Sequence, residues 1–273
     1  MTETTTTATV TATTTARPFP DAAEVEAARA LLAAWDDQQA AYVTDREGRF
    51  AIMLDVVDHV VPEGGVVLDL ASGPGSISRR VLERRPDVTC IAVDHDPVLL
   101  ELGRTALADH ADRVRFVDAD LWDRDWARVL EGTAPHAVLS STALHWLPAD
   151  VLARVYADLG RVVPEDGVVL NADHLRADDG RLLFAELSDR DDRRTQEEGR
   201  AAGAATWDEW WSEVVAVERY GRLAGERERR FADRPANPDL SLAFHVEALR
   251  VAGFAEAGPL WQHLDDFVVL ARR

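Results

Sequence analysis

The sequence predicts an α/β fold with a doubly wound sheet of seven strands, and three observations carry the prediction. Five short apolar runs alternate with helical stretches between residues 66 and 170, which is typical of parallel strands joined by crossover helices. A glycine-rich turn follows the first run. Such turns join a strand to a helix where α/β folds bind ligands. Two more apolar runs close the chain, and they predict an antiparallel C-terminal hairpin at the sheet edge.

Two amphipathic helices should precede the sheet. Apolar side chains recur at helical spacing in residues 21–43, and the pattern returns in residues 50–61, just before Pro62. We expect residues 21–61 to be N-terminal lid helices. Residues 1–20 are rich in Thr and Ala and lack the basic and apolar segments of a secretory signal, so we expect a disordered tail there.

The predicted strands are short apolar runs, as buried strands require. They span residues 66–70, 89–93, 114–117, 137–140 and 167–170, followed by 258–261 and 267–271 near the C-terminus. A further helix should lie between Ser241, which can cap its start, and Gly253, which can end it.

Residues 176–235 interrupt this pattern with a charged, helix-like segment that holds 12 Arg against 15 Asp and Glu. We expect a helical cap inserted into a single domain that runs from residue 21 to residue 273. Trp207, Trp210 and Trp211 follow one another at helical spacing, so they should share one face of a cap helix. Such a stripe more often packs a cap onto a core, yet its place in the cap makes Trp207 and Trp211 candidate substrate contacts.

Composition limits the partners. The 273 residues include 49 acidic and 30 basic side chains, for a net charge of -19, and every basic residue is Arg, so no catalytic lysine exists. A chain this acidic has no general field for phosphate backbones or anionic membranes, so we expect a small-molecule partner, no nucleic acid, no membrane, and a monomer or homodimer. The single cysteine, Cys90, excludes an intramolecular disulfide, and no apolar run approaches the roughly 20 residues of a membrane span. We therefore expect a cytoplasmic protein.

The most informative segment is residues 68–78, where a buried strand runs into a glycine-rich turn and then a helix. Gly73 and Gly75 let the backbone pass close to a ligand, and the following helix presents free N–H groups to it. Asp94 ends the second strand about twenty residues later, where a carboxylate can accept both hydroxyls of a ribose. Asp69 lies inside the first strand, where it can orient the loop or an ammonium group.

Two ligands suit this unit, a dinucleotide and S-adenosylmethionine, and a third interpretation has no ligand. The dinucleotide fingerprint has a third glycine where this chain has Ser78, and it has no acid inside the first strand. A nicotinamide-dependent site is therefore the weaker alternative, and a plain glycine turn in an α/β fold is the weakest.

Four motifs together resemble the class I S-adenosylmethionine-dependent methyltransferases, and the resemblance runs from about Trp35 to the C-terminus. The motifs are residues 69–75, Asp94, residues 116–121 after the third strand and residues 143–148 after the fourth. The resemblance implies a Rossmann-like methyltransferase sheet with S-adenosylmethionine as its cofactor. Ala71 departs from the family, which usually has a glycine at that position of the loop.

The resemblance also implies roles for single residues. The loop would lie against the methionine part of the cofactor, Asp94 would hold the ribose, and Asp120 with Leu121 would contact the adenine. The full set of expected cofactor contacts is Tyr42, Arg46, Asp69, Ala71, Ser72, Gly73, Gly75, Asp94, His95, Asp120, Leu121 and Ser140. Residues 139–147 look like the branch that includes trans-aconitate methyltransferase and other small-acid methyltransferases.

Methyl transfer from a sulfonium needs alignment and exclusion of water more than it needs catalytic groups. A carboxylate acceptor requires no base, whereas a hydroxyl or an ammonium must lose a proton. His145 and His174 follow the fourth and fifth runs, at the sheet edge where open α/β folds bind ligands, so both are candidate catalytic residues. His145 could equally be a structural histidine in its own loop, beside Trp146, which is a further candidate substrate contact.

The N-terminal helices offer Tyr42 and Arg46 as candidates for closing the site, and Arg46 could pair with the cofactor carboxylate. The alternative is a solvated helix face with ordinary ion pairs. No metal site is expected, because the alternating acids of residues 118–125 lack the central Gly and terminal Glu of a calcium loop.

The sequence therefore predicts a transferase that carries a methyl group from S-adenosylmethionine to a small-molecule acceptor in specialised metabolism. O-methylation of a hydroxyl or carboxylate is favoured, and N- or C-methylation stays open. The two alternatives are a nicotinamide-dependent oxidoreductase and a methyltransferase-fold protein that binds the cofactor without transferring its methyl group.

Overall fold

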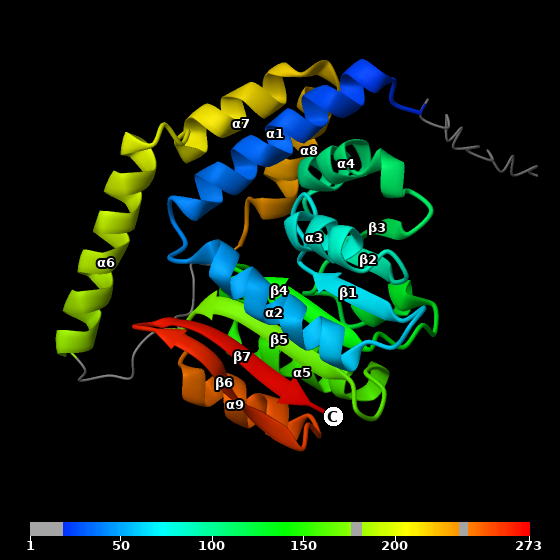
Figure 1. The fold of residues 1–273 in the computed structure, drawn as a ribbon, viewed down its shortest axis with the longest axis vertical. Helices are drawn as coiled ribbons and strands as arrows, with labels where there is room; N and C mark the ends of the chain where they lie inside the picture. Colours follow the sequence, from blue (N-terminus) through cyan, green and yellow to red (C-terminus); the bar gives the residue numbers. More distant parts are fainter. Residues whose placement is uncertain (1–18, 176–181, 235–239) are drawn as a thin grey trace, which may run out of the picture.

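The computed structural model of the chain describes residues 19–175, 182–234 and 240–273. The predicted tail, residues 1–20, lies outside the described residues except for its last two positions. One seven-stranded sheet forms the centre of the molecule, in the order β3-β2-β1-β4-β5-β7-β6 (Figure 1). The strands are β1 (Val66–Leu70), β2 (Thr89–Asp94), β3 (Val114–Asp118), β4 (Ala137–Ser141), β5 (Val168–His174), β6 (Glu256–His263) and β7 (Asp266–Arg272).

The direction of the strands confirms the doubly wound sheet and the C-terminal hairpin. Strands β1 to β5 pair parallel with one another, β7 pairs antiparallel with β5, and β6 pairs antiparallel with β7. β5 is longer than the predicted run of residues 167–170, because β7 pairs with it from Val168 as far as His174. Its polar second half, which includes Asn171 and Asp173, resembles a loop in sequence, although both side chains are buried.

Helices cover both faces of the sheet, as buried parallel strands require. One face carries α2 (Arg46–Val60), α3 (Ser76–Arg84) and α4 (Pro97–Ala106), and the other carries α5 (Ala149–Val162) and α9 (Leu242–Val251). Ser241 caps α9 by accepting a hydrogen bond from the backbone of Phe244, and Gly253 follows that helix with φ of +98°, as predicted for both residues.

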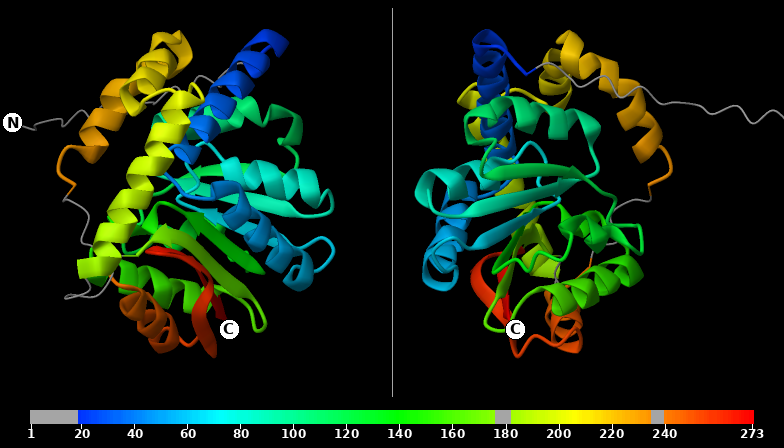
Figure 2. Two further views of the ribbon diagram at one scale, coloured as in Figure 1. Left: turned by 60° about the vertical axis from the view of Figure 1, so that its left-hand side comes forward. Right: turned by 90° about the vertical axis from the view of Figure 1, so that its right-hand side faces the viewer.

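The remaining helices gather beyond the carboxyl ends of the strands. They are α1 (Ala22–Ala40), α6 (Leu182–Ala201), α7 (Trp207–Ala216) and α8 (Glu218–Phe231), and Figures 1 and 2 show α1, α7 and α8 beside one another above the sheet. α6 lies at the side, where Asp191 connects Thr44, in the link between α1 and α2, to His263 on the hairpin. The helical content predicted for residues 176–235 is therefore present in three separate helices.

The sole cysteine, Cys90, lies on β2 and is buried, and burial raises the pKa of its thiol far above the usual value. A thiol in that position is unreactive, because the nucleophilic form is the thiolate. Among the described residues, no helix has both the length and the apolar character needed to cross a bilayer.

Candidate functional site

The glycine loop begins with a residue in a strained conformation. Ala71, directly after β1, has φ of +56°, in the left-handed region that costs a residue with a Cβ about 1 kcal/mol. Gly73 and Gly75 also have positive φ, of +55° and +85°. A Cβ on Gly75 would come within 2.9 Å of the ring of Phe116, whereas a Cβ on Gly73 would meet only ordinary contacts at 3.9 Å or more. The loop therefore has no room for a side chain at Gly75 but leaves space for one at Gly73.

Asp69 holds the loop against the helix that follows it. One of its carboxylate oxygens accepts hydrogen bonds from the backbone N–H of Ser78, at 3.0 Å, and from the hydroxyl of the same residue, at 2.7 Å. Burial raises the pKa of Asp69 to about 7, against the opposing effect of those two bonds. Ser78, which stands where a dinucleotide loop has its third glycine, is thus the partner of Asp69.

Asp94 binds three backbone N–H groups at the end of β2. It accepts hydrogen bonds from Gly73, His95 and Asp96, each at 2.7 Å. Protein surrounds it closely enough that burial raises its pKa to about 6, although the side chain keeps some exposure where it lines a cavity. Three bonds leave the carboxylate with acceptor capacity for a ligand hydroxyl.

These residues line a cavity of about 810 Å³ at the carboxyl edge of the sheet. It brings together many of the residues predicted from sequence, namely Arg46, Asp69, Ala71, Ser72, Gly73, Asp94, His95, Asp120, Leu121, His145, Trp146 and Trp207. Five predicted residues do not line it, namely Tyr42, Gly75, Ser140, His174 and Trp211. A second hollow of about 710 Å³, beside α2 and the hairpin, contains none of the predicted residues.

A histidine and a buried aspartate face one another at the edge of this cavity. His145, in a short 3₁₀ turn (η3, Leu144–Trp146), donates from Nδ1 to Asp173 Oδ1 at 2.5 Å, and its backbone N–H donates to Asp173 Oδ2 at 3.0 Å. Burial by itself would raise the pKa of Asp173, but His145, with His245 and His174 beside it, holds that pKa below its usual range. The ring is therefore oriented, with Nε2 left to accept a proton.

His174 lies on the other face of β5, because successive side chains of a strand alternate. Its Nδ1 is 2.7 Å from Asp266 Oδ1, and Arg49, fully buried on α2, pairs with the same oxygen. Burial would lower the pKa of His174, but the bond to Asp266 holds it above the usual value. The predicted catalytic role of His174 stays a prediction.

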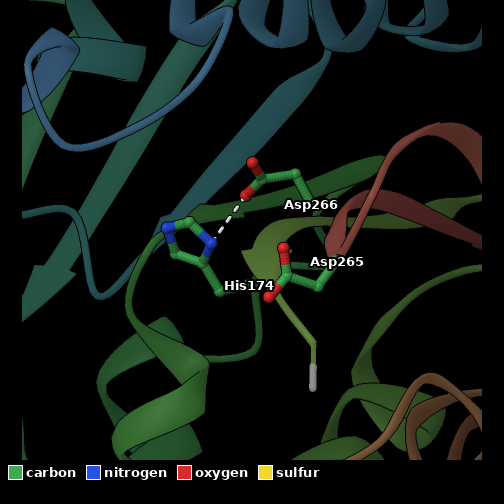
Figure 3. A group of neighbouring side chains, drawn as sticks. All are labelled: His174, Asp265 and Asp266. Atoms are coloured by element: carbon green, nitrogen blue, oxygen red, sulfur yellow. Dashed lines mark ion pairs between the residues drawn. The ribbon is translucent and has the colours of Figure 1, made fainter. Parts of the chain in front are cut away.

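Figure 3 shows that Asp265 joins this group, in which one ligand atom of each residue lies within 4.8 Å of the others. Such a group could hold a cation. The guanidinium of Arg49 already supplies the positive charge opposite Asp266, so we propose no metal here.

α1 and α2 bring a cluster of charged residues to the methionine side expected for the cofactor. Arg46 lines the cavity and pairs with Asp36 at 2.9 Å, and Asp36 also accepts from Ser76 at 2.6 Å. Burial would raise the pKa of Asp36, but Arg46 and Arg80 hold it below its usual range. Tyr42 comes after the end of α1, whereas Gln39, one turn earlier, lines the cavity in its place.

Arginines of α8 and of the segment just after it cover the far end of the cavity. Arg234 pairs with Asp120 and lies over the ring of Trp122, 4.7 Å from its centroid. Arg230 binds Asp118 with two hydrogen bonds of 2.8 and 2.9 Å, and it also donates to the carbonyl of His95.

The three cap tryptophans take different positions on α7. Trp210 is fully buried against Trp35, with ring centroids 4.6 Å apart, as the packing interpretation predicted. Trp207 is 42% exposed and lines the cavity, whereas Trp211 lies beneath the guanidinium of Arg227 at 3.8 Å.

Sequence reasoning missed several residues of the site. Asp173 orients His145, and further residues line the cavity, among them Trp35, Gln39, Phe231, Arg227 and Arg234. The available signal for Asp173 was its place directly before His174, near the end of a strand. Arg227, Phe231 and Arg234 gave none, since nothing in this charged segment distinguishes the side chains that reach the cavity.

Residues 67–167 match the family described as a methyltransferase domain. Among curated proteins, the trans-aconitate 2-methyltransferase of an Azoarcus species is 32% identical over 116 residues, 42% of this chain and 41% of that protein. The ribosomal RNA small subunit methyltransferase H of a Nostoc species is 28% identical over 176 residues, 64% of this chain and 48% of that protein. The chain spans less than half the length of these curated relatives.

Solved structures share the fold at low sequence identity. A putative O-methyltransferase of Nostoc punctiforme has a TM-score of 0.54 and 15% identity, over 92% of this chain and 60% of that one. Human N-acetylserotonin methyltransferase has a TM-score of 0.52 and 12% identity, over 92% and 55% of the two chains. Both structures are similar to this chain in their fold, that is, in the sheet and its helices.

Proposed function

The chain contains a class I S-adenosylmethionine-dependent methyltransferase domain, and from that premise we propose that it methylates a hydroxyl group of a small molecule. The observation that carries the proposal is the oriented pair of His145 and Asp173 at the edge of the cavity that the glycine loop and Asp94 also line. When bound, S-adenosylmethionine supplies an electrophilic methyl group on a sulfonium.

The residues around the loop suit such a cofactor. Gly73 leaves space that a side chain would fill, and Asp94, at the end of β2, has acceptor capacity left for a ribose hydroxyl. Arg46, with five donors and only part of them used by Asp36, can take a carboxylate. Asp69 would place its negative charge near an ammonium group, which favours ionisation of a carboxyl whose pKa is about 7.

His145 would act as the general base. Because its Nδ1–H donates to Asp173, Nε2 is the nitrogen that can take a proton from the acceptor. A carboxylate acceptor would need no such group, so the pair narrows the sequence-based prediction from hydroxyl or carboxylate to hydroxyl. Asp173, buried and held ionised, stabilises the imidazolium that results.

The cavity wall supports a small, flat acceptor. Trp146, 57% exposed, and Trp207 both line the cavity that His145 lines, and exposed tryptophans offer apolar area at low entropic cost. α8, with Phe231 on the wall and Arg230 bound to Asp118, would serve as the lid that excludes water. The RNA named for one set of relatives suits a chain of net charge -19 less well.

The proposal is tested by turnover of S-adenosylmethionine with a panel of phenols and aliphatic hydroxy compounds. We expect His145→Ala to lower the turnover number about 100-fold or more, since a general base contributes roughly 10²–10⁴. Its affinity for S-adenosylhomocysteine should stay within about threefold of the original, which calorimetry would show. His59→Ala, an exposed histidine of α2, is the matched control. Full activity in His145→Ala would contradict the role of His145 as general base.

Two other outcomes separate the alternatives. Tight binding of a nicotinamide dinucleotide, read by its fluorescence, with none of S-adenosylhomocysteine, would favour the oxidoreductase. Binding of S-adenosylhomocysteine with no methylated product across hydroxyl, carboxylate and amine acceptors would favour a protein of this fold that does not transfer methyl groups.

A further inference from the structure

The loop that joins β4 to η3 contains a residue in a backbone conformation that its side chain disfavours. Thr142 has φ of +55°, in the left-handed region. Six non-glycine residues in the described part of the chain have positive φ, and Thr142 is the one β-branched residue among them. Because a branched Cβ crowds the backbone in this region, glycine or asparagine would fit the position better. Threonine there needs an explanation beyond the local backbone geometry.

Hydrogen bonds to β5 hold this loop at both of its ends. The backbone N–H of Thr142 donates to the carbonyl of Ala172 at 2.8 Å. The backbone N–H and Nδ1 of His145 donate to the carboxylate of Asp173, the next residue of β5. Thr142 and His145 are therefore anchored to adjacent residues of one strand, which fixes their positions relative to each other. Strained residues persist where the surrounding structure fixes them in this way, and they cluster at functional sites.

The strained threonine belongs to the wall of the large cavity. Among the non-glycine residues with positive φ, Ala71 and Thr142 line this cavity and the others do not. Ser141 and His145 line it as well, so three polar side chains of one loop meet the same space.

The hydroxyl groups of Ser141 and Thr142 form a pair with unused hydrogen-bonding capacity. Oγ of Ser141 is 3.2 Å from Oγ1 of Thr142, so one hydroxyl donates to the other. The second hydroxyl hydrogen has no acceptor among the residues that the structure describes. Both residues are partly exposed, so a molecule in the cavity can bind to the pair.

The hydroxyl pair lies close to the proposed base. Thr142 and His145 are three positions apart, so their Cα atoms are within about 10 Å even in a fully extended chain. A β-branched side chain has few allowed rotamers, so the fixed backbone of Thr142 also defines the direction of its hydroxyl. One small molecule can therefore contact His145 and the hydroxyl pair at the same time, through two of its own polar groups that lie near each other.

We propose that Ser141 and Thr142 determine specificity, because their hydroxyl pair binds an oxygen on the carbon next to the one whose hydroxyl is methylated. The inference rests on the proposed function, in which His145 takes the proton of that hydroxyl. The acceptor class is then a compound with oxygens on two neighbouring carbons, as in a catechol. The reacting oxygen faces Nε2 of His145, and the neighbouring oxygen is hydrogen-bonded to the hydroxyl pair.

Binding of catechol, hydroquinone and phenol to the chain saturated with S-adenosylhomocysteine tests this specificity, by ligand-observed NMR. Hydroquinone has the same two hydroxyls as catechol, but on opposite sides of the ring. We expect the original chain to bind catechol about tenfold more tightly than either other probe, which corresponds to one hydrogen bond. Thr142→Gly and Ser141→Ala should each remove most of this preference, whereas Thr142→Ser should keep it.

Stability provides the second reading. Thr142→Gly relieves the left-handed strain, so the Tm should rise by about 2 °C while the preference for catechol is lost. Glu131→Gly is the matched control, because Glu131 has φ of +54° and does not line the cavity. It should gain stability and keep the preference. A purely structural role of Thr142 would predict the opposite link, with selectivity lost only in a less stable protein.

Equal affinity of the original chain for the three probes, or no measurable binding of any, would overturn the inference. A preference that survives in both Thr142→Gly and Ser141→Ala would overturn it too. The binding measurement needs no turnover, so the two proposals can fail separately. A preference for catechol without methylation of any hydroxyl compound would refute the proposed function and leave the hydroxyl pair as a binding subsite. Methylation of hydroxyl compounds without that preference would refute the specificity alone.

Discussion

Asp94 combines two tasks in one carboxylate, since it ties the glycine loop to β2 and faces the cavity. Asp94→Ala removes a charged acceptor from the proposed ribose site, and we expect cofactor binding to weaken by about 1.5–3 kcal/mol. Calorimetry with S-adenosylhomocysteine measures this loss. Asp112→Ala, an exposed carboxylate just before β3, should leave the affinity unchanged. An equal affinity in Asp94→Ala would exclude the ribose contact.

The two raised carboxyl pKa values predict a pH dependence of cofactor binding. Asp94, with a pKa of about 6, accepts ligand hydroxyls best when ionised, so affinity should rise from pH 5 and level off above pH 6. Asp69 has a pKa of about 7, so if it faces the ammonium group the affinity should keep rising up to about pH 7. Calorimetry from pH 5 to pH 8 on Asp94→Asn and Asp69→Asn assigns each part. A flat profile in the original chain would refute both assignments.

Ala71 offers a test of the loop in the folded protein itself. Because its φ is +56°, Ala71→Gly relieves left-handed strain, and we expect the free energy of unfolding to rise by about 0.5–1 kcal/mol. The gain is net of the extra freedom that glycine has in the unfolded chain. Ala143→Gly, at φ of -138°, should instead lower stability by a similar amount. Thermal or urea unfolding compares the two variants.

At the scale of elements, ion pairs help to hold α8 over the cavity. Arg230→Ala removes two bonds to Asp118 and one to the carbonyl of His95. We expect faster amide exchange in α8 and faster release of S-adenosylhomocysteine, with the difference from the original chain shrinking in high salt. Hydrogen exchange and stopped-flow release measure these effects. Arg229→Ala is the control, because among the described residues this arginine pairs only with Glu226 on the same helix.

The elements themselves were largely predictable. The five parallel runs and the terminal hairpin appear where apolar periodicity placed them, because strands buried on both faces must be apolar. Periodicity could not show that β5 continues to His174, since its last residues are polar and gain their partners from β7, about 95 residues away. Nor could periodicity divide the cap into α6, α7 and α8. These helices pack against α1 and α4, and the sequence does not show that packing.

At the scale of the whole molecule, the net charge of -19 makes a prediction about partners. Some curated relatives are named for ribosomal RNA, yet so acidic a chain should repel a polyphosphate backbone. We expect no change in the fluorescence anisotropy of a labelled ribosomal RNA hairpin at about 50 mM salt, where non-specific binding is strongest. A basic RNA-binding protein is the positive control. Saturable binding would make RNA a candidate methyl acceptor again.

The site was predictable where one chain segment carries it and not where several segments meet. The loop of Ala71 to Gly73 and Asp94 lie in local motifs, so sequence located them. Asp173 reaches His145 only because β4 and β5 are neighbours in the sheet, and a sequence carries no direct mark of that pairing. The same holds for Arg234, whose partner Asp120 follows β3, more than 100 residues earlier in the chain.

The buried position of Cys90 has a practical consequence for watching this protein move. Since the natural thiol lies inside β2 and the chain has no lysine, the surface of the described residues offers no competing thiol or side-chain amine to a reactive dye. Glu228→Cys, at an exposed site on α8, would therefore take a fluorophore at one place only. A single molecule labelled there would report opening and closing of the helix over the cavity in real time.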